Sequence, residues 1–78
     1  MNSNLKTQLK SYTVPMDVYM DILRILLPNK IRNQVEAINE GQNSISLRIE
    51  ILSGNNLHQR AIENIEITLN DYAHFLNG

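Results

Sequence analysis

The sequence predicts a small α+β domain with the element order strand–helix–helix–strand–helix. Three segments carry this prediction: an alternating apolar run over residues 45–51, an apolar segment over 15–27, and a long segment over 57–76 with apolar residues three or four apart. A single strand is not stable alone, because its backbone N–H and C=O groups need partners. We therefore expect the sheet to be completed by the chain's own N-terminal segment, by a second copy or by another protein, and we favour dimerisation.

Length and composition narrow the class of protein. The 78 residues predict one domain, and the absence of cysteine excludes disulfides and thiolate metal sites. No apolar run is long enough to predict a membrane span, and the N-terminus lacks the apolar core of a signal peptide, so we expect a cytoplasmic protein. Residues 1–32 hold five basic and two acidic side chains, whereas residues 33–78 hold two basic and six acidic ones. These opposite net charges favour contact between the two halves, within one chain or between chains.

A strand is expected over residues 7–14. Tyr12, Thr13 and Val14 prefer extended backbone, and Pro15 biases the residue before it in the same direction. Leu5, Leu9 and Tyr12 also fit one side of a helix. An all-α alternative, with residues 4–12 and 44–52 helical, therefore stays open.

The first helix is expected over residues 15–27. Pro15 suits a first helical turn, Asp17 complements the positive end of the helix, and Pro28 ends it. Outside a narrow strip of Asp17, Asp21 and Arg24, almost every position is apolar. An ordinary surface helix has a narrower apolar stripe, so this helix should be covered on most sides.

A second, shorter helix is expected over residues 29–40. Asn29 is a suitable N-cap, and Ile31, Val35 and Ile38 repeat at helical spacing. Gly41 can adopt the left-handed conformation that commonly ends a helix.

The alternating strand over residues 44–52 ends in a turn at 53–56, and the last helix follows over 57–76 with Asn55 or Asn56 as its cap. Its apolar residues at spacing 3-4-3-4 are Ile62, Ile65, Leu69, Tyr72 and Leu76. We expect this face to pack on the sheet and on helix 15–27. Ile67 lies on the polar side, so a competing interpretation makes residues 65–69 a second alternating strand.

No pattern of residues predicts catalysis or a cofactor. Glu66, Asn70 and His74 stack one turn apart, but asparagine is a poor metal ligand, so a solvated polar face is favoured. His58 lies near the start of a predicted helix, and the sequence contains no nucleophile motif for which it could act as a general base. We therefore expect no enzyme activity, no metal and no cofactor.

The order strand–helix–helix over Thr7–Gly41, with Thr13–Tyr19 at the strand-to-helix junction, resembles the ribbon-helix-helix family. The resemblance implies a dimeric DNA-binding regulator or antitoxin whose paired strands enter the major groove, with Lys6, Gln8 and Lys10 available to contact bases. The acidic C-terminal half and a pI of about 6.0 oppose phosphate binding. DNA binding is therefore the alternative hypothesis.

The first hypothesis is a non-enzymatic protein-interaction or regulatory module, homodimeric or docking on a larger protein. It rests on more apolar surface than one small core needs. No membrane role is expected. The candidate interface residues are Tyr19, Met20, Leu23, Leu27, Leu47, Ile49, Ile67 and Phe75.

Overall fold

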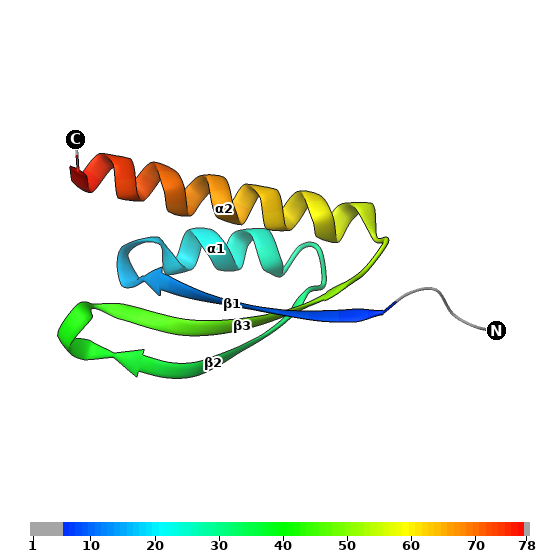
Figure 1. The fold of residues 1–78 in the computed structure, drawn as a ribbon, viewed down its shortest axis with the longest axis horizontal. Helices are drawn as coiled ribbons and strands as arrows, with labels where there is room; N and C mark the ends of the chain where they lie inside the picture. Colours follow the sequence, from blue (N-terminus) through cyan, green and yellow to red (C-terminus); the bar gives the residue numbers. More distant parts are fainter. Residues whose placement is uncertain (1–5, 78) are drawn as a thin grey trace.

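A computed structural model, which describes residues 6–77, confirms a small α+β domain (Figure 1). The elements in order are strand β1 (Thr7–Pro15), 3-10 turn η1 (Met16–Val18), helix α1 (Tyr19–Leu26), strand β2 (Arg32–Asn39), 3-10 turn η2 (Glu40–Gln42), strand β3 (Ser44–Leu52) and helix α2 (Asn56–Asn77). The all-α alternative is therefore wrong. The expected element order is also wrong, because residues 32–39 form a strand where a second helix was predicted.

The three strands form one antiparallel sheet in the order β1-β3-β2. β1 pairs with β3 without interruption, from Thr7 opposite Leu52 to Pro15 opposite Ser44. β2 pairs with the other side of β3, with a register shift between Val35 and Ala37. The alternating strand therefore has partners on both sides within one chain. Its completion does not require a dimer, and none is shown.

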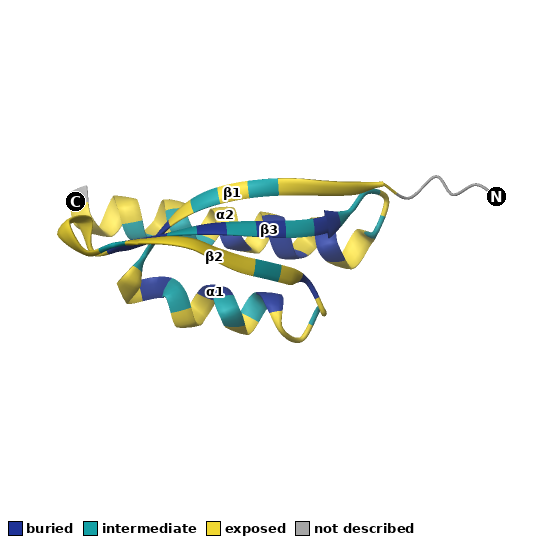
Figure 2. Cartoon of the chain, turned by 90° about the horizontal axis from the view of Figure 1, so that it is seen from below, coloured by how far each residue is buried: buried dark blue, intermediate teal, exposed yellow. Residues whose placement is uncertain are grey.

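The core lies on one face of the sheet, beneath both helices. Figure 2 shows α2 behind β1 and β3, and α1 along the β2 side. The four alternating residues of β3 point toward the helices and are at most 4% exposed. The other residues of the core cluster are Val14, Val18, Ile22, Leu26, Ile31, Ala61, Ile62 and Ile65. The opposite face of β3 carries Ser46, Arg48 and Glu50 and is covered by no helix.

A tight cap ends α1 and turns the chain into β2. The Lys30 N–H donates to the carbonyl of Leu27 and the Ile31 N–H to the carbonyl of Leu26, both at 3.1 Å. Lys30 adopts a left-handed backbone with φ 55°. These two bonds and this conformation define a Schellman cap. Asn29, expected to begin a helix, instead donates from Nδ2 to the Ile25 carbonyl at 2.7 Å.

The helix predicted over residues 29–40 is wrong because a bulge imitates helical spacing. Val35 and Ile38 lie opposite Leu47 and Ile45, which both face the helices. Residues three apart cannot share a face of a regular strand, but one extra residue at Glu36 restores the alignment. Gly41 does not end a helix either, because it lies in η2.

The last helix is confirmed over Asn56–Asn77, and Asn55 caps it by accepting a 3.1 Å bond from the His58 N–H. Ile62 and Ile65 are buried, and Leu69 and Tyr72 pack against the same core. The strand alternative for residues 65–69 is wrong. Two tyrosines fix the helix to the rest of the domain. Tyr12 donates to Glu66 at 2.9 Å and Tyr72 to Asp17 at 2.5 Å.

Candidate functional site

Exposed apolar side chains gather on α1 and on the strand beside it. Met20 is 58% exposed and Leu27 is 64% exposed, although both lie in or next to a helix whose Ile22 and Leu26 are fully buried. The stripe at spacing 4-3-4 consists of Met16, Met20, Leu23 and Leu27. Residues at this spacing share one side of a helix. The stripe therefore runs along one side of α1, where Met16, Met20 and Leu27 are exposed and Leu23 packs partly against the core.

β2 contributes apolar residues next to α1. Val35 and Ile38 face the helix layer through their register with β3, yet they remain 38% and 61% exposed. α1 lies along this side of the sheet (Figure 2), and the exposure of both residues indicates that it does not cover them. We call Met20, Leu27, Val35 and Ile38 the α1–β2 flank.

The structure divides the predicted interface residues among three places. Tyr19, Met20, Leu23 and Leu27 all lie in or beside α1, where Tyr19 and Leu23 are half-buried against the core. Leu47 and Ile49 are fully buried under the chain's own helices, so they are not surface residues in this fold. Ile67 and Phe75 are exposed on α2.

The sequence analysis missed Val35 and Ile38 as surface residues. Their i, i+3 spacing predicted the buried stripe of a helix, whereas the edge strand leaves both exposed. A test of β propensity would have been the available signal, because Val and Ile favour strands.

Opposite charges lie on α1 and on the uncovered face of β2. On α1, Arg24 and Asp21 form an exposed pair at 3.3 Å. On β2, Arg32 approaches Glu50 at 4.0 Å and Glu36 approaches Arg48 at 3.5 Å. Such exposed pairs contribute at most about 1 kcal/mol each to stability.

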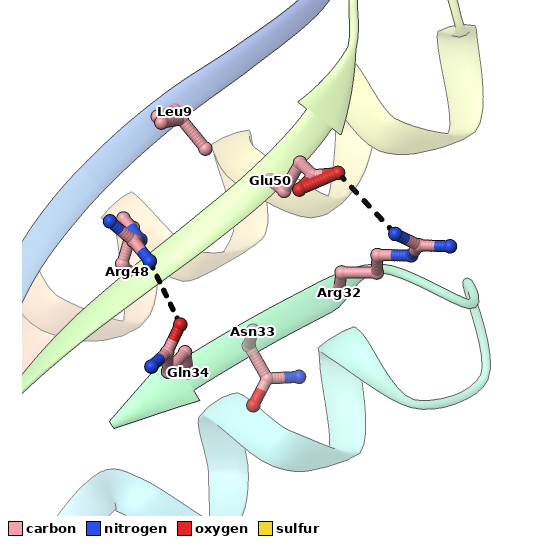
Figure 3. A pocket seen from close by; sticks show the side chains of 6 residues that line it. All are labelled: Leu9, Arg32, Asn33, Gln34, Arg48 and Glu50. Carbon is pink, nitrogen blue, oxygen red and sulfur yellow. Dashed lines mark hydrogen bonds and ion pairs between the residues drawn. The ribbon is translucent and has the colours of Figure 1, made fainter. Parts of the chain in front are cut away.

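The uncovered face of the sheet holds a polar hollow of about 290 Å³ (Figure 3). Its lining residues are Leu9, Arg32, Asn33, Gln34, Arg48 and Glu50. Arg48 donates to Gln34 at 2.8 Å, and the Arg32–Glu50 pair lies at its end. Binding of single-stranded nucleic acid needs aromatic rings for base stacking. Leu9 is the one apolar side chain among these six described residues.

A second hollow of about 320 Å³ lies where β1 begins and β3 ends. Its lining residues are Thr7, Lys30, Arg32, Glu50, Leu52 and His58. The His58 ring is buried, and its Nδ1 accepts a 3.0 Å bond from the Leu52 N–H. Since Nδ1 is the acceptor, the neutral ring carries its hydrogen on Nε2.

The hydrogen bonds of the two tyrosines raise the pKa values of their phenols. Burial, with the hydrogen bond to Glu66, raises the pKa of Tyr12 to about 12. The bond to Asp17 raises the pKa of Tyr72 above its ordinary value. Glu66, first member of the polar stack with Asn70 and His74, is therefore engaged with β1. Over residues 6–77, no three His, Cys, Asp or Glu side chains group as metal ligands.

The structure does not contain the element order on which the resemblance to ribbon-helix-helix proteins rested, because β2 replaces the second helix. Gln8 and Lys10 lie opposite Ile51 and Ile49, on the helix-facing side of the sheet. Among the described helices, none is long and apolar enough to cross a membrane. Comparison of the chain with protein-family models, curated proteins and solved structures finds no match.

Proposed function

We propose that this chain is a non-enzymatic protein-interaction module that forms a homodimer through its α1–β2 flank. The supporting observation is the exposure of Met20, Leu27, Val35 and Ile38 on two adjoining elements of a domain with a complete core. Apolar groups gathered outside the core mark association surfaces on small proteins.

The stripe favours a second copy as the partner, because it is complementary to itself. A two-fold axis runs the two α1 helices antiparallel, so that Met20 of one chain faces Leu27 of the other. Arg24 lies one turn from Met20 and borders this contact, whereas Asp21 lies further round the helix.

β2 carries charges of both signs along the same sheet edge, on the uncovered face of the sheet. Arg32 and Glu36 lie four residues apart, and an antiparallel second β2 centred on Gln34 places each opposite the other. β1 offers no such match, because Lys10 is the one charged residue within it. The bulge at Glu36 interrupts backbone pairing along this edge, so side-chain packing of the two flanks provides most of the contact.

The test compares two substitutions of equally exposed apolar residues. Met20 is 58% exposed in the flank and Ile67 is 56% exposed on the outer side of α2. Sedimentation equilibrium is run at about 100 µM, well above the dissociation constant of an interface of standard size. We expect a dimer for the wild type and for Ile67→Asp, and a monomer with unchanged circular dichroism for Met20→Asp.

Two results overturn the homodimer. A strictly monomeric wild type would do so, and it would leave the flank available to a larger partner protein. A dimeric Met20→Asp variant would place the contact elsewhere, and dissociation by Ile67→Asp alone would place it on α2.

A further inference from the structure

We propose that the hollow lined by Lys30, Arg32 and His58 binds an oxyanion, a phosphate or carboxylate group. This inference does not depend on dimerisation. The three side chains come from the end of α1, the start of β2 and the first turn of α2, and the fold brings them to one cavity of about 320 Å³.

The balance of charge in the hollow is positive. Lys30 and Arg32 provide two cations, and Glu50 provides the one carboxylate among the described lining residues. Glu50 does not neutralise Arg32 closely, because the two atoms are 4.0 Å apart and the Arg32 side chain is 86% exposed. The guanidinium can therefore turn toward an anion and donate two parallel hydrogen bonds.

His58 supplies a donor that the backbone holds in place. The residue is only 7% exposed, and the Leu52 N–H bond to Nδ1 fixes the orientation of the ring. Nε2–H is then its free donor in the neutral form, since Nδ1 is occupied. An oriented donor loses little freedom when a ligand binds, unlike the side chains of Lys30 and Arg32.

Lys30 occupies a position at which glycine is more stable. It has φ 55° at the left-handed position of the Schellman cap, where a side chain beyond Cα is unfavourable. A strained residue that lines a cavity points to a use for its side chain. Lys30 lines the hollow together with Arg32, so its ammonium group can reach an anion bound there.

The experiment titrates ¹⁵N-labelled protein with inorganic phosphate and with acetate at constant ionic strength, with chloride as the salt control. Saturable shifts are expected for the Lys30 and Arg32 amides and for the His58 ring. Stronger binding of phosphate indicates a phosphorylated ligand, and stronger binding of acetate indicates a carboxylate.

Two substitutions test the charges that line the hollow. Asparagine tolerates the left-handed backbone, so Lys30→Asn should weaken binding roughly three- to five-fold, the effect of losing one exposed charge pair. Glu50→Gln should strengthen it by a similar factor.

Lys30→Gly separates binding from folding. Relief of the strained backbone should raise the melting temperature by several degrees, while anion binding falls as in Lys30→Asn. The proposal is overturned if neither the wild type nor Glu50→Gln shows a saturable shift, or if Lys30→Gly binds as the wild type does. Repeating the titration with Met20→Asp gives the same result if the site belongs to the single chain, and loss of binding there contradicts it.

Discussion

The two edge strands flank the same central strand, but β1 is the better covered of the two. β1 pairs with β3 along all nine of its residues, buries Val14 completely and is tied to α2 through Tyr12. β2 is interrupted by a bulge, and six of its eight residues are exposed. β3 is therefore hydrogen-bonded to a strand on each side, but the helices cover the two edge strands unequally.

Helix length explains this difference. The 22 residues of α2 span about 33 Å, enough to follow a nine-residue strand from end to end. The eight residues of α1 span about 12 Å, less than half the length of β2. A short helix over a long edge leaves apolar side chains exposed, and this is the origin of the α1–β2 flank.

The largest effect is expected from a substitution in β3, the strand with which both edge strands pair. Ile49 is fully buried on β3, between Lys10 of β1 and Asn33 of β2. Ile49→Asp buries an unpaired carboxylate at a cost of several kcal/mol, comparable with the whole stability of a small domain. We expect loss of the circular dichroism signal, while Ile67→Asp stays folded. A folded, monomeric Ile49→Asp would mean that this face is an interface and not the core.

A matched pair of substitutions then compares the two edges directly. Val14→Ala on β1 should lower the free energy of unfolding by about 2–3 kcal/mol, since a fully buried side chain is shortened. Val35→Ala on β2 should cost about 1 kcal/mol or less, because that side chain is already 38% exposed. Denaturant titration in the Met20→Asp background keeps loss of the dimer out of the measurement. Equal costs would show that β2 is as well covered as β1.

The smallest expected effect concerns the hydrogen bond from Tyr12 to Glu66, which ties β1 to α2. The folded pKa of Tyr12 is about 12, above the ordinary value of 10, so folding favours the neutral phenol. The stabilisation is present in full below pH 10 and is lost as the pH rises from 10 to 12. The bond to Glu66 is solvent-exposed, so screening reduces this stabilisation to about 0.5–1 kcal/mol. Tyr12→Phe should lose that amount at pH 8 and show a shallower decline from pH 10 to 12, with Tyr19→Phe as the control.

Most of the architecture was predictable, because periodicity is read directly from residue spacing. β1, β3, α2 and the α1 segment lie close to their expected bounds. β2 was not predictable in this way, because its bulge at Glu36 changes the two-residue spacing of a strand into a spacing that resembles a helix. A bulge is set by the partner strand, and one strand's sequence does not show it.

The candidate sites were predictable only in part. Met20 and Leu27 were expected at an interface because their helix holds more apolar surface than a small core needs, and both are exposed. Leu47 and Ile49 were assigned there because β2, the second partner of their strand, was predicted as a helix. Lys30 gave no signal, since left-handed backbone is inferred from glycine or asparagine and not from lysine.

The position of β3 between two earlier strands also governs how the chain folds as it is synthesised. β1 and β2 emerge first but are not neighbours in the sheet, so neither has a ladder partner until residues 44–52 follow. Within this stretch α1 is the element whose hydrogen bonds are all local. Entry of β3 then sets both registers together, so the sheet forms and melts as one cooperative unit.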